Sequence, residues 1–562
     1  MHKKSGLKCD KANFRPISIL PTISKACEAV IDARLLAHCT DNNIISERQA
    51  AYLKGGSTIN QLLYILHQIY TAWGGHKVVQ GIFLDIKGAF DKMWHKGLIA
   101  KLDQIGIEDN FLQLFASYLS GRKQIVVVDG IQSEVKNITS GCPQGSKLGP
   151  LLFIIYINDI IKDLECEILL FADDTTLIAI GQTKEETATM LNRDLQRIDI
   201  WAKRWKVTFN ASKSKQIIFS KKKLQSLPII FNQEEIKQVD TLKHLGVVLT
   251  RNLDWTEQVN FVCLKANRKL GVLRSVLGLS RQTLDILYKL TVRSQIDYGL
   301  IIYYNDLTQK QKTRLDQIQY KAGKIVSGAL HLTNRVKLDN ELGWESLQSR
   351  TNFLGLTLYQ KIHILQTRPL LRQCMTKPKI NYHDLRQKTT YPKHKYLNMK
   401  HKNSYFPYFT NLWNNTPERA IFDFEQFKIK LKERLKPKKF KFYKYGCKQG
   451  NKLITSLRVG RSLLNADCFS IGLAPSPECN CGAKSENSRH ILLSCPLFET
   501  HRQTMLGLVE QQLSKFKKLN LRTKENILLF GYKPENNDFV KLNINITLAV
   551  QTFLLKTNRF ER

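Results

Sequence analysis

The stretch EILLFADDTTLIAI, residues 167–180, constrains the fold more than any other part of the sequence. Two apolar, β-rich arms flank Asp173 and Asp174, which predicts two strands joined at an acidic turn. Burying a carboxylate costs several kcal/mol unless something pairs with it. The nearest basic residues in the sequence are Lys162 and Lys184. Either the pair lies on an exposed turn, or a cation that is not part of the chain neutralises it.

A third carboxylate, Asp85, stands at the end of another apolar run, GIFLDIKGAFD. Two strands that bring Asp85 and the Asp173–Asp174 turn to one sheet edge would create a carboxylate cluster without a basic partner. Mg²⁺ needs only a few protein carboxylates, and two such ions about 3.5–4 Å apart stabilise the attacking and leaving oxygens of phosphoryl transfer. The alternative is ordinary turn chemistry, because Asp tolerates the backbone angles of hairpin turns.

The charge of the chain indicates a polyanionic partner. Its 562 residues carry 86 Lys and Arg against 48 Asp and Glu, a formal net charge of +38, and a hydrophobic fraction of 43% is ample for folded cores. Nucleic acid is the commonest polyanion and an anionic membrane the second. The longest apolar run, LGPLLFIIYI, is too short to span a membrane, so no membrane partner is expected. Twelve scattered cysteines suit reduced thiols better than a disulfide framework.

The pattern changes along the chain. Residues 1–250 alternate short β-rich runs with helical segments, and from Asp254 the pattern becomes helical. Between Tyr391 and Arg458 we count 17 Lys or Arg, four Asp or Glu, and 14 aromatic residues. Basic side chains bind phosphates and aromatic rings stack on unpaired bases, so this stretch predicts a nucleic-acid surface. The first helix after Asp254 is expected to bury one face, made of Val259, Val262, Cys263, Ala266, Leu270 and Leu273.

Near the C-terminal end, CNCGAKSENSRHILLSCP contains a C-x-C-x8-H-x4-C series: Cys479, Cys481, His490 and Cys495. These are four ligands of the types that zinc prefers. The C-x-C pair is tighter than the usual C-x2-C, so the spacing alone leaves zinc binding and buried free thiols equally open.

Seven motifs along the first 250 residues, taken in order, resemble those of a known family. The series is similar to reverse transcriptases, and more narrowly to the polymerase of non-LTR (LINE-type) retrotransposons of the jockey-like group. The resemblance is strong over about the first 250 residues. Its motifs are NFRPISIL (13–20), QAAYLKGGSTINQL (49–62), FLDIKGAFD (83–91), GCPQGSKLGPLLFIIYINDI (141–160), FADD (171–174), NASK (210–213) and HLGV (244–247).

The resemblance implies an α+β fold of the right-hand polymerase type, with fingers, a palm with an antiparallel sheet, and a helical thumb. A basic, mostly helical region with a Cys/His zinc element follows. The expected parts are fingers and palm (1–250), thumb (251–365), a basic aromatic-rich connector (366–470) and a C-terminal region with a zinc-knuckle-like element (471–562).

Residue roles follow from the same resemblance. The metal ligands for two Mg²⁺ ions, which Mn²⁺ could replace, are Asp85, Asp173 and Asp174, with the carbonyl of Ile86 as a backbone ligand. Phe90 matches the aromatic gate that excludes a 2′-hydroxyl, for which a plain core Phe is the alternative. Further nucleotide contacts are expected from Gln144, Gly145, Lys213 and Arg15, and the HLGV segment matches the part that grips the primer end.

Some residues depart from the family pattern. Ala51-Tyr52-Leu53 stands where Gly-Phe-Arg is common, so a phosphate contact is expected to be lost or moved to Lys54. Gly88 and Lys147 are also unusual. The chain is further expected to lack an endonuclease domain because its first residues already resemble the fingers.

The lead hypothesis is therefore an RNA-directed DNA polymerase with an RNA template, a DNA primer or target DNA, and dNTPs as partners. Zinc at the Cys/His series is favoured, with Lys484 and Arg489 inside its loop. The chain is expected in the nucleus after a cytoplasmic ribonucleoprotein stage, and no feature indicates an oligomeric state. Two alternatives stay open: a catalytically inactive nucleic-acid-binding remnant, and an RNA-dependent RNA polymerase, whose turn is more often Gly-Asp-Asp.

Overall fold

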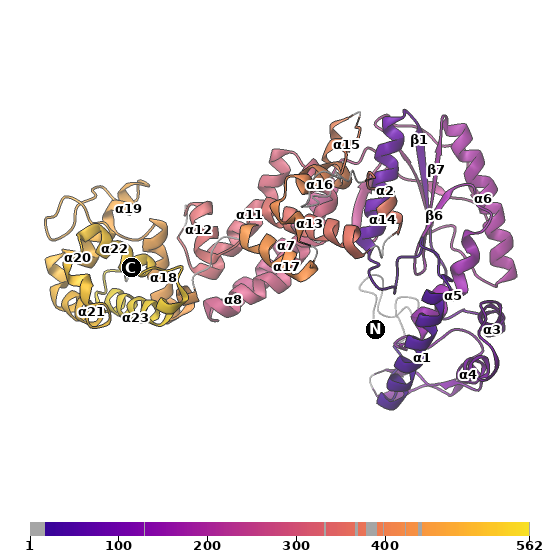
Figure 1. The fold of residues 1–562 in the computed structure, drawn as a ribbon, viewed down its shortest axis with the longest axis horizontal. Coiled ribbons are helices and arrows are strands. Elements are labelled where there is room, and N and C mark those ends of the chain that lie inside the picture. Colours follow the sequence, from indigo (N-terminus) through magenta and orange to yellow (C-terminus); the bar gives the residue numbers. More distant parts are fainter. Residues whose placement is uncertain are drawn as a thin grey trace. The chain divides into compact units, whose positions relative to one another are not determined.

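The computed structural model describes residues 17–128, 130–330, 333–365, 369–377, 391–396, 398–421, 423–435 and 441–560 (Figure 1). Arg15 lies outside these residues. The chain forms two compact units. Unit 1 comprises Met1–Trp255 and Tyr359–Thr416, and unit 2 comprises Thr256–Leu358 and Pro417–Arg562.

A five-stranded mixed sheet forms the centre of unit 1, with the strand order β11-β8-β1-β7-β6. The pairs β6–β7, β7–β1 and β1–β8 are antiparallel, and β11 runs parallel to β8. Figure 1 shows helices α2 and α6 on opposite sides of these strands, which explains why the strands read as nearly continuous apolar runs. The strands are β1 (Val78–Leu84), β6 (Glu167–Phe171), β7 (Asp174–Gly181), β8 (Lys215–Phe219) and β11 (Lys237–Gln238).

Helices pack around this sheet: α1 (Thr22–Asp41), α2 (Thr58–Gly74), α3 (His95–Gln104), α4 (Asp109–Leu119), α5 (Gly149–Ile157) and α6 (Lys184–Arg204). The longest apolar run of the sequence is α5, and all its residues except Pro150 are buried in the core. Among the described helices, none combines the length and the apolar character that a membrane crossing requires.

Short two-stranded ribbons complete the first 255 residues. They are β2 (Lys123–Gln124) with β5 (Lys136–Asn137), β3 (Val127–Val128) with β4 (Ile131–Gln132), β9 (Ile230–Phe231) with β10 (Glu234–Glu235), and β12 (Thr241–His244) with β13 (Val247–Thr250). The HLGV motif spans the turn of the β12–β13 hairpin, where Leu245 (φ 44°) and Gly246 (φ 83°) both adopt positive φ. Two positive φ angles are what a two-residue hairpin turn of type I′ requires.

The second segment of unit 1 packs on α2. It contains the end of α13 (Leu347–Leu365), then α14 (Pro369–Gln373), α15 (Met399–Asn403) and α16 (Tyr405–Asn414). The rings of His67 and Phe406 lie 5.0 Å apart between their centroids, and Tyr70 stacks on His401 at 6.3 Å. Aromatic side chains from the described residues of the range 391–416 thus pack on α2, the helix that covers one face of the sheet.

This packing corrects one expectation. Most aromatic residues of the basic segment are core residues: Tyr391, Tyr405, Phe406, Phe409, Trp413, Phe427, Phe442 and Tyr443 are all buried. They cannot stack on unpaired bases, so the interpretation of their composition as a stacking surface is wrong for these residues. Basic neighbours such as Lys393, Lys402 and Lys430 remain exposed.

Within its described residues, unit 2 consists of helices and the loops that join them, with no strand. The face predicted after Asp254 is confirmed, because all six of its apolar residues are buried in α7. The α-helices are α7 (Thr256–Ser275), α8 (Arg281–Leu287), α9 (Ser294–Asp297), α10 (Leu300–Tyr303), α11 (Gln309–Ser327), α12 (Arg335–Leu342), the start of α13, α17 (Phe424–Leu435), α18 (Lys448–Val459), α19 (Asn465–Phe469), α20 (Ser488–Leu493), α21 (Glu499–Gln512), α22 (Leu521–Phe530) and α23 (Val540–Lys556).

A buried ion network ties early and late helices of unit 2 together. Glu341 on α12 accepts hydrogen bonds from Arg281 at 3.0 Å and from Arg458 at 3.3 Å, and Thr455 also donates to it at 3.2 Å. Glu341 and Arg458 are both buried, so the charges are paired as burial requires. Residues 281–341 and 448–459 therefore belong to one folded body.

Two glycines with nearly equal backbone angles offer a stability test. Gly141 (φ 81°) would place a Cβ 2.5 Å from the Asp91 carbonyl oxygen, whereas no described atom lies within 4 Å of such a Cβ at Gly130 (φ 84°). We expect Gly130→Ala to lower the free energy of unfolding by about 1–2 kcal/mol from backbone strain alone. Gly141→Ala should cost clearly more, because the backbone of Asp91 must shift. Urea unfolding of both variants checks this, and equal losses would contradict it.

Candidate active site

Three carboxylates gather at one end of the sheet of unit 1. Asp85 follows β1 directly, and Asp174 is the first residue of β7. The antiparallel register places Leu84 opposite Thr175, so Asp85 and Asp174 flank neighbouring positions of paired strands. Phe171 pairs with Asp174, which leaves Ala172 and Asp173 as a two-residue turn. The acidic hairpin predicted from residues 167–180 is therefore present.

The exposure and the charges of this cluster show how the chain tolerates adjacent carboxylates. Asp173 and Asp174 are exposed, and Asp85 is half-buried. The pKa of Asp174 is raised to about 6, first by partial removal from water and then by the negative charges of Asp173 and Asp85. The turn is exposed, and its acids also repel each other, so a bound cation would lower the energy of the site.

A buried glutamine holds the acidic turn in place. Gln49 forms a parallel bridge with Leu170 on β6, and its side-chain oxygen Oε1 accepts hydrogen bonds from the backbone N–H of Ala172 at 3.1 Å and of Ala51 at 2.9 Å. Ala172 has φ 55°, the positive value that a two-residue turn needs at its first position. Sequence reasoning assigned no role to Gln49. The QAAYLKGGS motif contains it, but nothing in the sequence reveals its long-range hydrogen bond.

The NASK segment supports Asp85 from the other side. The N–H of Asn210 donates to the carbonyl oxygen of Asp85 at 2.7 Å, and the N–H of Asp85 donates to Ser214 Oγ at 3.2 Å. Ile86 is buried and bridges to Phe209. Lys213 belongs to the turn that Asn210 begins, and it is exposed. Lys213 thus lies in the turn whose first residue, Asn210, bonds to the backbone of Asp85.

Phe90 and the residues of the PQGS motif form a second supported group. The Phe90 ring is half-buried and lies 4.6 Å from the Phe153 ring, and its carbonyl accepts from the N–H of Cys142 at 2.9 Å. Gln144 Nε2 donates to Asp91 at 2.7 Å. Gly145 is exposed at φ 119°, in the region that favours glycine. The loop after β1 therefore carries Phe90 and positions the amide of Gln144.

Two further residues contact the acidic cluster or its strands. Tyr52 lies close enough to Asp173 that this charge, after burial, raises the pKa of its hydroxyl. His244 is buried beneath the strands, with its ring 4.7 Å from Phe83 and Nε2 3.3 Å from Thr176 Oγ1. Burial lowers the pKa of His244 to about 3, so it is neutral and fixes the β12–β13 hairpin to β1 and β7.

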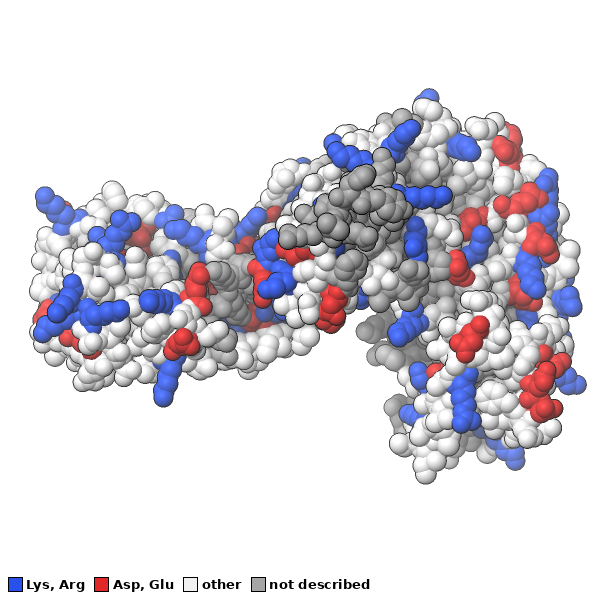
Figure 2. All heavy atoms as spheres, viewed as in Figure 1, with Lys and Arg blue, Asp and Glu red and all other residues white. Residues whose placement is uncertain are grey.

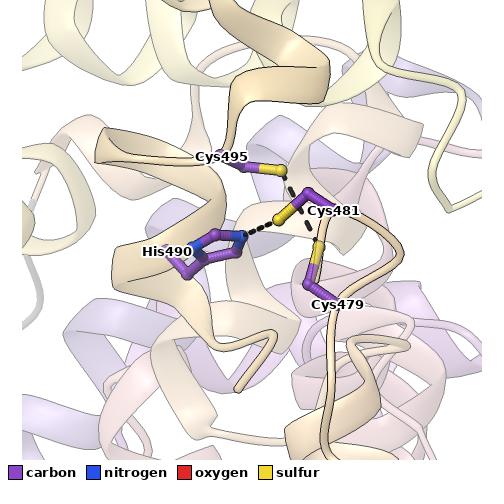
Figure 3. Close-up of side chains that lie close together, drawn as sticks. All are labelled: Cys479, Cys481, His490 and Cys495. Carbon is purple, nitrogen blue, oxygen red and sulfur yellow. Dashed lines mark hydrogen bonds between the residues drawn. The ribbon is translucent and has the colours of Figure 1, made fainter. Parts of the chain in front are cut away.

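The Cys/His series forms a four-residue cluster in unit 2 (Figure 3). One potential ligand atom from each of Cys479, Cys481, His490 and Cys495 lies within 4.8 Å of the others. Cys479 and Cys495 Sγ are 3.7 Å apart, and Cys481 Sγ is 3.2 Å from His490 Nε2. Two sulfurs on a tetrahedral zinc ion stand about 3.8 Å apart, given Zn–S bonds of about 2.3 Å. The cluster therefore fits a metal, and the reading as unrelated free thiols loses its support.

The cluster has its own supporting contacts. Glu486 is buried and lies between Cys481 and His490 in the sequence. Its carboxylate accepts a hydrogen bond from the Arg559 side chain at 2.7 Å and another from the backbone N–H of Asn465 at 2.7 Å. Its N–H donates to the carbonyl of Pro477 at 2.7 Å. These bonds close the loop that presents the cysteines, as the supporting groups of structural metal sites do.

Carboxylates that meet at the end of paired antiparallel strands are typical of enzymes that transfer phosphoryl groups with divalent metal ions. The family comparison agrees with this class. Residues 1–249 match the family described as "Reverse transcriptase (RNA-dependent DNA polymerase)". The match places a reverse transcriptase domain in residues 1–249, somewhat less than half of the chain.

Its relatives include polymerases of non-LTR retrotransposons of the jockey-like group. The chain is 31% identical over 352 residues to the probable RNA-directed DNA polymerase from transposon X-element of Drosophila melanogaster, covering 61% of this chain and 38% of that protein. It is 28% identical over 343 residues to the polymerase from mobile element jockey of the same species, covering 58% and 37%. The chain thus spans less than half the length of these relatives.

A similarity to solved structures is also found. A telomerase from Candida albicans, in complex with a fragment of telomeric RNA, covers 62% of this chain and 57% of its own. The TM-score is 0.32 and the sequence identity 10%.

The raised pKa of Asp174 predicts a pH-dependent stability effect. Because the folded-state pKa of about 6 exceeds the ordinary aspartate pKa of 3.8, the folded protein loses stability as pH rises from about 4 to about 6, and the loss persists at higher pH. At pH 7.5 without metal, the free energy of unfolding of Asp174→Asn should therefore exceed that of the parent, by about 1 kcal/mol once solvent screening is allowed for. The difference should vanish near pH 4. Urea unfolding at both pH values measures it, and a variant less stable at pH 7.5 would contradict the repulsion.

The Cys/His cluster predicts metal uptake. We expect about one zinc ion per purified chain, and near none after Cys495→Ser, because three ligands hold a structural zinc poorly. Plasma mass spectrometry of both proteins after dialysis measures this. Cys27→Ser is the matched control, since Cys27 is exposed on α1 and outside the cluster. If the parent chain contains no zinc after expression in zinc-supplemented medium, the Cys/His cluster is not a zinc site.

Proposed function

We propose that this chain copies an RNA template into DNA by extending a DNA primer with deoxynucleoside triphosphates. One observation carries the proposal. Asp85, Asp173 and Asp174 meet at one sheet end inside the segment that matches the reverse transcriptase family. In this proposal the sheet of unit 1 is the polymerase palm, and the helices that follow residue 255 begin the thumb.

The carboxylates hold two divalent ions. Asp85 and Asp173 are the main ligands, Asp174 contributes to holding the ions or the turn, and the carbonyl of Ile86 completes the set. Bound Mg²⁺, or Mn²⁺ in its place, would stabilise the charge of the attacking and leaving oxygens. The backbone bonds to Asp85 and Ala172 keep the acids in place against their mutual repulsion. The residues fit these ions because they offer the oxygen ligands that hard cations prefer.

Phe90 selects the sugar of the incoming nucleotide. Its ring is supported by Phe153 and only half-buried, so one side remains available beneath a ribose. A ring in that position leaves no room for a 2′-hydroxyl, the group that separates ribonucleotides from deoxynucleotides. Gln144 and Gly145 contact the nucleotide from the adjoining loop, where Gln144 already bonds to Asp91.

Two basic residues are assigned to the triphosphate. Lys213 is exposed in the turn that bonds to Asp85, where an ammonium group can neutralise or protonate the leaving pyrophosphate. Arg15 is assigned to template or triphosphate by its motif alone. The β12–β13 hairpin, anchored by His244, is the proposed grip on the primer end.

Nucleic-acid affinity is proposed to be mainly electrostatic. The net charge of +38 favours a polyanion, and Figure 2 shows Lys and Arg side chains over both units on the face drawn. The Cys/His element, with zinc as its metal, adds a folded basic surface through Lys484 and Arg489. Nuclear action after a cytoplasmic ribonucleoprotein stage remains part of the proposal.

The competing proposal is a remnant that binds nucleic acid without copying it. The charge and the Cys/His cluster support binding in either case. What favours catalysis is that Asp85, Asp173, Asp174, Gln144 and Lys213 are all present, and that hydrogen bonds support the backbone at Asp85 and Ala172.

Primer extension separates the two. With poly(rA)/oligo(dT), dTTP and Mg²⁺, we expect the parent to extend the primer and Asp173→Ala to lose at least about 10³-fold in rate, as when one essential electrostatic group is removed. Glu234→Ala, an exposed acid on β10, is the control and should extend normally. Gel analysis of primer length provides the measurement.

Two outcomes would reverse parts of the proposal. If neither parent nor variant extends while both bind the hybrid, the chain is a binding remnant. If the parent incorporates ribonucleotides as readily as deoxynucleotides, Phe90 is not a gate and an RNA polymerase becomes the better proposal. Phe90→Val should otherwise admit ribonucleotides, while leaving dTTP incorporation measurable.

A further inference from the structure

Beside the acidic turn, unit 1 contains a cavity of about 200 Å³ that the polymerisation chemistry does not use. It is lined mainly by residues 45–61, together with Tyr64, Leu169, Leu370 and Leu371. Its lining is mostly apolar side chains and backbone. The volume is below the roughly 300–1,000 Å³ of drug-sized pockets, so it suits a single planar ring rather than a large ligand.

Two buried glutamines in the lining have unpaired amide atoms. Gln61 is 3% exposed, and among the described residues neither its Nε2 nor its Oε1 has a hydrogen-bond partner. Gln49 is 2% exposed, and its Nε2 is likewise unpaired. The orientation of the Gln49 amide is fixed, because its Oε1 accepts from two backbone N–H groups. An unpaired buried polar group is costly, and both residues meet at this cavity.

The border of the cavity carries two basic side chains, Arg48 and Lys54, and one acidic side chain, Glu47. Gly55 and Gly56 lie in the lining just before the N-terminal end of the 17-residue helix α2, whose dipole favours negative charge there. Lys54, also in the lining, is exposed. Arg48 adds a further guanidinium, shared with Glu167 at 3.4 Å. An apolar hollow with amide groups inside, and with Lys54 and the start of α2 at its border, matches one nucleotide whose base lies inside and whose phosphate lies outside, on the side away from Glu47.

We propose that this cavity binds a single unpaired nucleotide, separate from the nucleotide that is being incorporated. Uracil is the base that matches it best, because its two carbonyls and one N–H complement two unpaired amide donors and one acceptor. The nucleotide comes either from an unpaired part of the template strand or from free ribonucleotide. The template arm rests on the proposed function, whereas the free-nucleotide arm does not.

Occupancy would act on the acidic turn through one residue. Gln49 faces the cavity as part of its lining, and its Oε1 holds the N–H of Ala172, the residue before Asp173. A base that engages Gln49 Nε2 therefore stiffens the group that positions Asp173. Gln49 is a positioning residue in this scheme, and it does not touch the reacting atoms.

Binding of short oligonucleotides to the full chain tests the proposal. The probe is an RNA/DNA duplex with a four-uridine 5′ RNA overhang, measured by fluorescence anisotropy without dNTPs. Each overhang base is replaced in turn by an abasic site. We expect one abasic position to weaken binding to the parent about fivefold or more, the usual effect of losing one base contact. Gln61→Leu should bind all the probes alike.

The controls separate folding from binding. Gln68→Leu is half-buried on the same helix but outside the lining, and it should behave as the parent. If Gln61→Leu fails to fold, Leu371→Phe fills the cavity from another segment and should give the same loss. Titration with 5′-UMP tests the second source: binding to the parent that is lost in Gln61→Leu, without any abasic effect, assigns the cavity to free nucleotide.

Absence of both effects in the parent, or their persistence in Gln61→Leu and Leu371→Phe, overturns the proposal and leaves the cavity to water. Primer extension on the same samples keeps the two proposals apart. A parent that extends primers but shows no abasic or UMP effect disproves only the cavity, and a parent that binds UMP but does not extend disproves only the polymerase.

Discussion

Three like charges at one sheet end are the constraint on which unit 1 depends. The pKa of Asp174 is raised to about 6, first by partial removal from water and then by the charges of Asp173 and Asp85, so the site without a cation is less stable than a neutral one. Buried strands and backbone hydrogen bonds must offset this cost. The strand β1, paired on both sides, carries Asp85, and the oxygen of Gln49 fixes the turn that carries Asp173. Function thus requires a rigid sheet whose end is electrostatically unfavourable.

The parts around the cluster are held by the backbone rather than by salt bridges. The segment 141–146 bonds to Phe90 and Met93 through main-chain N–H groups, and Gly141 approaches the Asp91 backbone so closely that a Cβ would not fit. Segment 210–214 bonds to Asp85 in the same way. Backbone bonds position side chains without adding charge. These bonds therefore position the acids without reducing the negative charge that they offer to a cation.

Much of this could be predicted from local pattern. The hairpin at residues 167–180, the strand that ends at Asp85 and the buried face of α7 are each encoded in short stretches of sequence, and each is present. The spacing of Cys479, Cys481, His490 and Cys495 left zinc binding and free thiols equally open, the family resemblance favoured zinc, and the fold brings the four residues together. The role of Gln49 could not be predicted, because its hydrogen-bond partner Ala172 lies 123 residues away in the sequence. The stacking surface predicted for residues 391–458 was wrong for the buried rings, because composition cannot distinguish a ring that packs in the core from one that faces solvent.

The burial of those rings changes which force would hold nucleic acid. Phe406, Phe409 and Trp413 are each at most 1% exposed, while Lys393, Lys402 and Lys430 remain at the surface. Stacking gives affinity that salt affects little, whereas phosphate contacts release counterions and weaken steeply with ionic strength. Among the described residues of the range 391–435, Tyr396 is an exposed ring at 44%, and the binding of phosphates by basic side chains is the larger contribution that this surface offers. The buried amides near the acidic turn are groups suited to contact a base directly, a contact that salt affects little.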